Sequence, residues 1–166
     1  DRMLDETVAI KVLRGEFANT TDMLRRFKHE LKLARKVSHR NVCRIHEFGQ
    51  HVIEGFGPIF YLTMEYIEGE TLGARVRRGP PLSLEVVKSL SRQLLRGLAA
   101  AHAAGVLHRD FKSDNVMLRE RSSPGEGWEA VILDFGLARG LEREYEGLTE
   151  QHEFLGSAGY MAPEQL

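Results

Sequence analysis

The amino-acid sequence predicts a mixed α+β fold, because runs with strand character alternate irregularly with longer stretches of helical periodicity. Residues 7–13 and 59–67 are short, apolar and rich in β-branched or aromatic side chains, which is typical of strands. Helix-start signals stand at Thr20-Thr21-Asp22 and at Ser83, and each precedes apolar residues at helical spacing. Strands and helices therefore both contribute to the predicted fold.

Composition places the chain among ordinary globular proteins. It has 166 residues, of which 42% are hydrophobic and 28% charged, with a formal charge of −1. Near-neutral charge argues against a nucleic-acid or membrane-surface binder. Cys43 is the single cysteine, so an intrachain disulfide is excluded and a reducing, cytoplasmic location is expected. No apolar run approaches the ~18 residues of a membrane-spanning helix.

The first expected helix carries a carboxylate that needs a partner. It should end near Ser38, and its apolar residues recur at helical spacing: Leu24, Phe27, Leu31, Ala34 and Val37. Glu30 lies on or beside this stripe, where an unpaired charge is costly. Lys11, in the first strand, is the expected partner. The alternative is a solvated Glu30 that pairs with Lys28 or Arg26.

The sequence predicts a loop, a strand and two helices in the middle of the chain. Residues 50–58 are rich in turn formers and predict a loop before the strand at 59–67. Residues 71–78 predict a short helix that Gly79-Pro80-Pro81 ends. The helix that Ser83 caps should run to Gly105, with these inward residues: Leu84, Val87, Leu90, Ser91, Leu94, Leu98 and Ala101.

A loop from His108 to Asn115 carries the chemistry. Asp110 can accept a proton from a hydroxyl, and Lys112 can neutralise developing negative charge. The carbonyl oxygen of Asn115 suits a hard cation such as Mg²⁺. Asp134 adds a second carboxylate at the end of an apolar run, which completes the parts that phosphoryl transfer needs. The alternative gives Asp110 and Asp134 backbone roles only, in turns beside their strands.

Four motifs in order resemble the signature of eukaryotic-type serine/threonine protein kinases. They are Val8-Ala9-Ile10-Lys11, His108-Arg109-Asp110-x-Lys112-x-x-Asn115, Asp134-Phe135-Gly136 and Ala162-Pro163-Glu164. The amino-acid sequences at 33–36 and 41–45 resemble those of bacterial members of this kinase family. By contrast, the G-x-G-x-x-A match at 125–130 precedes a strand, so we interpret it as a chance match.

The resemblance implies a two-lobed kinase fold, with a partial small lobe at 1–67 and a partial helical lobe at 68–166. No glycine-rich phosphate loop precedes Lys11, and the sequence ends where further helices would follow. We therefore expect a truncated domain, with a sheet lobe lacking its first strands and a helical lobe lacking its later helices. Such a portion should be poorly active alone, and the parent protein could carry a membrane anchor.

The resemblance also assigns roles around ATP and Mg²⁺. Lys11, held by Glu30, would contact the α- and β-phosphates, while Asp134 and Asn115 would hold the metal. Asp110 would deprotonate the serine or threonine hydroxyl of a protein substrate, and Lys112 would contact the γ-phosphate. The adenine contacts would be Ala9, Met117, the gatekeeper Met64 and the backbone of Glu65 and Ile67. His108 would pack beneath Phe135.

The activation segment is expected at residues 140–153. Thr149 is the candidate phosphosite, with Tyr145 as the alternative, and Arg109 would receive the phosphate. Ser157 would bond Asp110 and Lys112, and Glu164 would pair with an arginine later in the domain.

Two other classes of protein fit parts of this pattern. A pseudokinase scaffold usually lacks the equivalents of Lys11, Asp110 or Asp134, and all three are present. A small-molecule kinase would share the two aspartates, but would not carry Lys112 at this spacing or the Ala-Pro-Glu motif.

Overall fold

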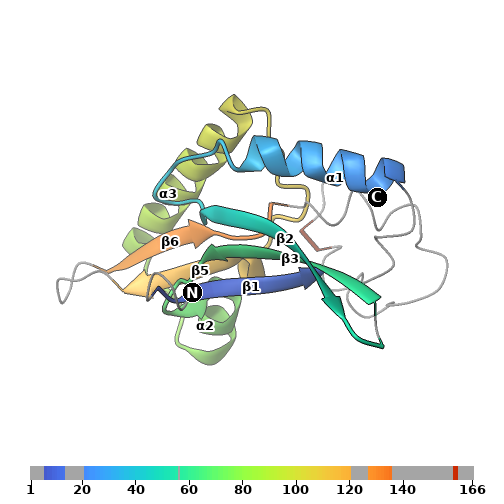
Figure 1. Cartoon of the computed structure of the whole chain (residues 1–166). Coiled ribbons are helices and arrows are strands. Elements are labelled where there is room, and N and C mark those ends of the chain that lie inside the picture. Colours follow the sequence, from blue (N-terminus) through green and yellow to red (C-terminus); the bar gives the residue numbers. More distant parts are fainter. Residues whose placement is uncertain (1–5, 14–20, 56, 121–126, 136–158, 161–166) are drawn as a thin grey trace.

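The computed structural model describes residues 6–13, 21–55, 57–120, 127–135 and 159–160 (Figure 1). Within these residues the chain forms two three-stranded sheets and three α-helices. The sheets follow one another along the sequence, and the long helices lie beside them (Figure 1).

The first sheet contains β1 (Val8–Leu13), β2 (Ile45–Ile53) and β3 (Gly57–Glu65), in the order β1-β3-β2 with antiparallel pairing. Helix α1 (Thr21–Ala34) packs its apolar side on this sheet. The buried residues of this core are Leu13, Phe27, Leu31, Phe60 and Leu62. Because α1 and β1 share this core, Glu30 and Lys11 belong to one packed unit.

The second sheet contains β4 (Glu70–Thr71), β5 (Val116–Glu120) and β6 (Trp128–Ile132), again antiparallel. Helix α2 (Leu72–Arg78) begins at Thr71, whose hydroxyl accepts a hydrogen bond from Ala74 N. Helix α3 (Leu84–Ala103) begins in the same way at Ser83. A 3₁₀ turn, η2 (Ser113–Asn115), leads into β5. Strand β5 therefore follows directly after the loop that carries Asp110.

The segment after α1 joins the two sheets. Cys43 N–H donates to the Ile132 carbonyl at 2.8 Å, and Ile132 N–H donates to the Asn41 carbonyl at 2.9 Å. Val42 forms an isolated bridge with Ile132. The loop that follows α1 is thus hydrogen-bonded to the end of β6, beside Asp134.

Several predicted boundaries were wrong. The predicted loop at 50–58 is strand up to Ile53, because cross-strand pairing with β3 overrides its local turn propensity. Helix α1 ends at Ala34, before the predicted Ser38, and β4 was missed. Strand β6 does follow Gly127, as the chance-match interpretation of 125–130 required.

The buried side of α3 also differs from the predicted stripe. Leu84 and Val87 are 66% and 43% exposed, whereas Gln93 and Gly97 are buried. Gly97 lies so close to the next layer that a Cβ there would be 2.9 Å from the Asn41 carbonyl oxygen. The helix therefore approaches residue 41 along a side that includes one glycine and one amide.

Candidate active site

Lys11 and Asp134 meet across the two sheets. Lys11 comes from the middle of β1, and Asp134 lies two residues beyond β6. Their Nζ and Oδ1 atoms are 2.9 Å apart, and the side chains are 40% and 37% exposed. The structure thus brings together two residues that lie 123 positions apart (134 − 11) in the sequence.

Asp110, Lys112 and Asn115 form a second group. Lys112 Nζ lies 3.2 Å from Asp110 Oδ2. Asn115 Nδ2 donates to the Asp110 carbonyl at 2.8 Å and to Asp110 Oδ2 at 3.1 Å. The 3₁₀ turn allows this, because it folds Asn115 back toward Asp110. With its amide nitrogen engaged, Asn115 presents its oxygen for another partner.

A backbone hydrogen bond connects the two groups. Leu133 N–H donates to the Asn115 carbonyl at 2.9 Å, so Asp134 follows a residue that is bonded directly to Asn115. The two carboxylates and the amide that sequence analysis singled out therefore belong to neighbouring strand ends.

The backbone is strained at two places in this cluster. Arg109 has φ of 61° and Asp134 has φ of 45°, and they are the non-glycine residues with positive φ in the described chain. The left-handed region is disfavoured for residues with a Cβ, and such strain concentrates at functional sites. The strain falls beside Asp110 and on Asp134, the residues with predicted chemical roles.

The predicted Lys11–Glu30 ion pair is wrong for this structure. Glu30 Oε1 instead lies 2.6 Å from Arg109 Nη1, while the amine of Lys11 is engaged by Asp134. The left-handed backbone of Arg109 and the position of α1 bring the guanidinium to the carboxylate. Arg109, the predicted phosphate receiver, is therefore paired with α1.

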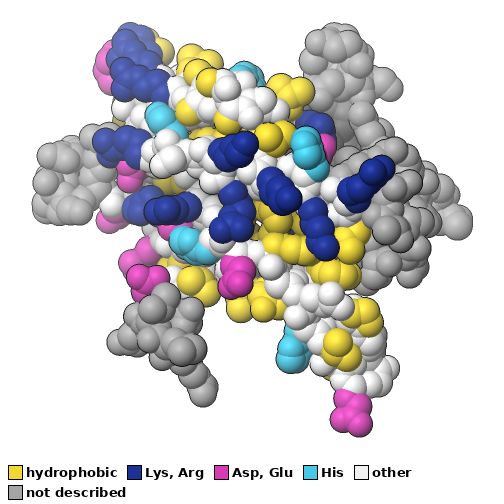
Figure 2. Space-filling view, turned by 45° about the horizontal axis from the view of Figure 1, so that its top comes forward, with side chains coloured by type: hydrophobic (Ala, Val, Ile, Leu, Met, Phe, Trp, Pro, Cys, Tyr) yellow, Lys and Arg dark blue, Asp and Glu magenta, His cyan; other side chains and the backbone are white. Residues whose placement is uncertain are grey.

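The alternative paired Glu30 with Lys28 or Arg26: the Lys28 pair is also not formed, and the side chain of Arg26 lies outside the described part of the chain. Residues two apart on a helix do not face each other. Lys28 and Lys32 lie on the exposed side of α1, with Arg35 and Lys36 just beyond it. Figure 2 shows Lys and Arg side chains gathered on the face where α1 lies. The formal charge of −1 thus conceals an uneven distribution of charge.

His108 packs as the resemblance implies. Its ring centroid is 4.9 Å from that of Phe135, and Nε2 lies 2.8 Å from the Leu133 carbonyl oxygen. A carbonyl only accepts, so Nε2 donates. Nδ1 is buried and has no hydrogen-bond partner among the described residues. Burial lowers the pKa of His108 below its ordinary value, against the opposing effect of the Leu133 carbonyl.

Apolar residues pack where the resemblance expects adenine. Met64 and Met117 pack against the buried residues Cys43, Ile67 and Val131. In β1, Ala9 is the cross-strand neighbour of Met64. Burial, and then the charge of Glu65, raises the pKa of the Cys43 thiol to about 12, which supports its interpretation as a core residue.

Four other predicted positions lie outside the described residues: Tyr145, Thr149, Ser157 and Glu164. Gly136 also lies outside them. Tyr160 is described, and its hydroxyl is 2.8 Å from Ser113 Oγ, so this late segment contacts the loop of Asp110.

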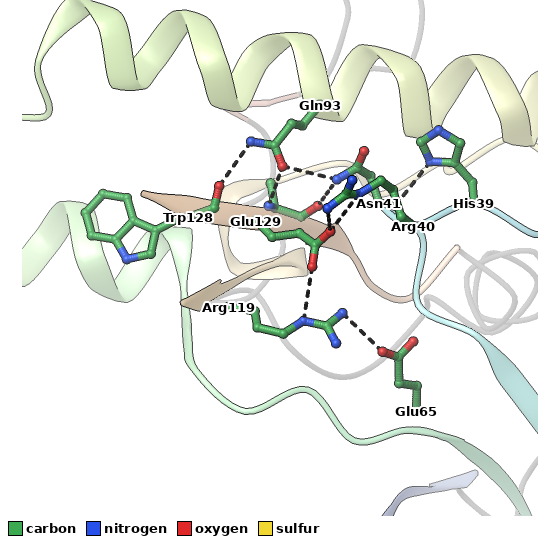
Figure 3. Close-up of polar contacts among 9 residues, drawn as sticks. His39, Arg40, Asn41, Glu65, Gln93, Arg119, Trp128 and Glu129 are labelled. Atoms are coloured by element: carbon green, nitrogen blue, oxygen red, sulfur yellow. Dashed lines mark hydrogen bonds and ion pairs between the residues drawn. The ribbon is translucent and has the colours of Figure 1, made fainter. Parts of the chain in front are cut away.

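Sequence reasoning missed a buried amide network formed by Asn41 and Gln93 against β6 (Figure 3). Asn41 Nδ2 donates to Gln93 Oε1 at 3.2 Å and to the Ala130 carbonyl at 2.7 Å. Gln93 Oε1 also accepts from Ala130 N–H at 2.9 Å, and its Nε2 donates to the Trp128 carbonyl at 3.1 Å. An available signal was the amide of Gln93 between the apolar residues Leu90 and Leu94.

It also missed a chain of alternating charges on the surface, formed by Glu65, Arg119, Glu129 and Arg40 (Figure 3). Arg119 Nη2 is 3.1 Å from Glu65 Oε1, and Arg119 Nε is 3.4 Å from Glu129 Oε2. Arg40 Nη2 lies 2.6 Å from Glu129 Oε1. No sequence signal identified this chain, because its members come from four separate segments.

Two searches of the described part of the chain found nothing. No group of three or more His, Cys, Asp or Glu residues there could hold a metal ion. None of its helices has the length and hydropathy required to span a membrane.

The model of the protein kinase domain family matches residues 1–166. The serine/threonine-protein kinase PkaA of Streptomyces coelicolor is 38% identical over 96% of this chain. PknA of Mycobacterium tuberculosis is 33% identical and PrkC of Bacillus subtilis 32% identical, each over 99% of it. The chain spans 27%, 36% and 24% of the lengths of these relatives, respectively.

Solved structures agree with this assignment. A mutant of the kinase domain of PknI from Mycobacterium tuberculosis superposes with a TM-score of 0.61 at 27% identity. The alignment covers 79% of this chain and 50% of that domain. The family match over the whole sequence, with Lys11 paired to Asp134 and the Asp110 loop hydrogen-bonded to the residue before it, shows that the chain belongs to the protein kinase domain family, with bacterial serine/threonine-protein kinases as relatives.

Proposed function

We propose that the protein containing this chain transfers the γ-phosphate of ATP to serine and threonine hydroxyls of protein substrates. The observation that carries the proposal is the Leu133–Asn115 backbone bond of 2.9 Å, which joins the Asp110 loop to Asp134. Family membership and the names of the relatives support the reaction class.

Asp110 is the proposed base. Its carboxylate is 19% exposed, accepts a hydrogen bond from Asn115 and forms an ion pair with Lys112. These two contacts fix the direction of its oxygens. An acceptor hydroxyl would give its proton to this carboxylate as its oxygen bonds to the γ-phosphorus, while the bond from that phosphorus to the β–γ bridging oxygen breaks and ADP leaves. Lys112 would then stabilise the negative charge that develops on the transferred group. Serine or threonine as the acceptor follows from Lys112 by resemblance.

Lys11, Asp134 and Asn115 are the proposed ATP and Mg²⁺ ligands. The oxygens of Asp134 and Asn115 are hard donors of the kind that Mg²⁺ prefers. When bound, Mg²⁺ would neutralise part of the negative charge of the phosphates. Asp134 now pairs with Lys11, so a nucleotide would take over both partners: phosphate for the amine and metal for the carboxylate.

The remaining assignments are proposals by resemblance. Ala9 and Met117 would flank adenine beside Met64, and the backbone of Glu65 and Ile67 would bond its edge. Glu30 would exchange Arg109 for Lys11 in the ATP-bound enzyme. The lobes would be residues 1–67 and 68–166, in a cytoplasmic kinase domain. Activation through Arg109 would involve the segment with these residues: Thr149, Ser157 and Glu164.

Labelling by radioactive ATP tests the function. The full-length protein should incorporate phosphate into serine and threonine of a peptide library, identified by phosphoamino-acid analysis. Asp110→Asn and Lys11→Met should each reduce incorporation by about 10²–10³-fold, the scale for loss of a catalytic acid–base or charged group.

Asp114→Asn is the matched control. Asp114 stands in the same loop, but its carboxylate pairs with Arg77 at 2.8 Å. This hydrogen bond from Arg77 lowers the pKa of Asp114 below its ordinary value. Incorporation near the wild-type level is expected. Equal labelling by all four proteins would overturn the assigned roles, and ATP binding without transfer in wild type would favour a scaffold.

A further inference from the structure

Arg119 is held between two carboxylates from different parts of the fold (Figure 3). Glu65 is the last residue of β3, and Glu129 lies in β6 next to Arg119 in the register of β5. The contact with Glu65 is 3.1 Å and the contact with Glu129 is 3.4 Å. Arg119 Nε is buried without an aligned hydrogen bond among the described residues, so the Glu65 contact is the better formed of the two.

Glu65 stands where the chain leaves the first sheet. Its N–H donates to the Arg44 carbonyl at 2.9 Å, and its carbonyl oxygen lies 3.7 Å from Cys43 Sγ. The next strand, β4, begins at Glu70 in the other sheet. The Glu65 backbone is thus held by the segment that leads into β2 and by its pairing with Val8 of β1, while its side chain is held by Arg119 of the second sheet.

The charge chain continues to the loop after α1. Arg40 donates to Glu129 through Nε at 2.7 Å, so Glu129 has a cation on each side. The side chain of Glu129 is 15% exposed. Without Arg119, no cation would stand between the carboxylates of Glu129 and Glu65. A guanidinium has a rigid, planar set of donors that a lysine amine lacks, so it can serve two carboxylates at once.

The exposure of these groups argues for a role in geometry. Glu65 and Arg119 are 32% and 35% exposed, and ion pairs at such sites contribute little to the free energy of unfolding. The pair does, however, attach the last residue of β3, after which the connecting segment begins, to the second sheet. Main-chain recognition of a base depends on the placement of such a residue within a few tenths of an ångström.

We infer that Arg119 is a positioning residue for adenine recognition. By holding the Glu65 side chain, it fixes the Glu65 carbonyl where it accepts a hydrogen from the 6-amino group of adenine. This inference rests on the proposed function, which gives that carbonyl its contact with adenine. Arg119 itself touches no substrate.

Nucleotide binding to the full-length protein tests the inference. Isothermal titration calorimetry would compare ATP with ITP, whose base carries an oxygen in place of the 6-amino group and cannot donate there. Arg119→Gln should weaken ATP binding by about 3- to 10-fold, the range for one misaligned hydrogen bond. ITP binding should change by less than about 2-fold, and Arg119→Lys should lie in between. KM for ATP should rise with little change in kcat.

Two further variants separate positioning from general structure. Arg78→Gln breaks a similar surface ion pair, with Glu70 at 2.6 Å, and should leave both nucleotides unaffected. Glu65→Gln keeps the backbone carbonyl and loses the charge. Its effect on ATP binding and that of Arg119→Gln should be less than additive in the double variant, because both remove one contact. Should Arg119→Gln fail to fold in a thermal scan, Arg119→Lys supplies the comparison.

Equal weakening of ATP and ITP, or additive effects of the two substitutions, would overturn the positioning role. A wild-type protein that binds ATP in preference to ITP but transfers no phosphate would overturn the proposed function alone. Unchanged ATP binding by folded Arg119→Gln would overturn this inference alone.

Discussion

The charged cluster around Asp134 lies just beyond the end of β6 and the amide network around Asn41 contacts β6 itself, yet they are built on opposite principles. The pairs Lys11–Asp134 and Glu30–Arg109 are all at least 31% exposed, and each links one cation to one anion. Asn41 and Gln93 are 2% and 9% exposed and share neutral hydrogen bonds with three backbone groups.

The difference indicates which groups can exchange partners. Exposed ion pairs contribute roughly 0–1 kcal/mol each, so a nucleotide or metal could replace one at little cost. Buried amides lose about 1–3 kcal/mol for each partner removed. The charged cluster is therefore suited to ligand exchange, and the amide network is suited to holding β6, α3 and residue 41 in fixed positions.

Substitution of the charged cluster should give the largest effect, and on activity alone. Asp134→Asn should lower phosphate transfer by about 10³-fold, since the proposed metal ligand would lose its charge. The free energy of unfolding should change by less than about 1 kcal/mol, because the pair with Lys11 is more than one-third exposed. Activity assays and urea denaturation measure the two quantities. If Asp134→Asn lowered the free energy of unfolding as well as phosphate transfer, the charged cluster would contribute to stability, and its contrast with the amide network would not hold.

The amide network should show the reverse. Gln93→Leu leaves the Ala130 N–H and the Trp128 carbonyl without their side-chain partner, at a cost of about 2–4 kcal/mol in the free energy of unfolding. Arg92→Leu, at an exposed neighbouring position of α3, should change it by less than about 0.5 kcal/mol. Denaturation of both variants provides the comparison. Similar values for the two would mean that the network contributes no stability.

His108 lies beside the charged cluster but is buried like the amides, so its effect should be smaller and dependent on pH. Burial lowers its pKa in the folded state, so the unfolded chain binds a proton more readily. Stability is therefore complete above the ordinary pKa of about 6.5 and is lost as pH falls from there toward the folded-state value. Denaturation from pH 7.5 to pH 5 should show a decline that His108→Phe reduces. An equal decline in that variant would assign the loss to other groups.

The sequence predicted the features that depend on interactions between residues close together in the chain better than those that depend on distant residues. Local signals located β1, α2 and α3, because the caps at Thr71 and Ser83 act within one helical turn. The motifs located Asp110, Asn115 and Asp134 through the resemblance.

The sequence did not indicate which side chains pair with one another when they lie far apart in the chain. Whether Glu30 pairs with Lys11 or Arg109 depends on how α1 sits over a loop 79 residues away. The partners of Asn41 and Arg119 lie on other elements, and the sequence does not indicate which side chains the packed elements bring together. The end of β2 was missed because pairing with β3, and not local propensity, extends it to Ile53.

The hydrogen bonds of Asn41 and Cys43 to Ile132 have a mechanical consequence for α1. They anchor the chain shortly after the C-terminal end of that helix to β6, and Ala34 at that end packs in the core that contains Ala101 and Ile132. Nearer the middle of the helix, Glu30 contacts Arg109. A rotation that carries Glu30 from Arg109 toward Lys11 would therefore turn about residues 41–43 as a pivot. In such a rotation the C-terminal end of α1, near residues 41–43, would move least. The displacement would grow along the helix and be largest at its N-terminal end.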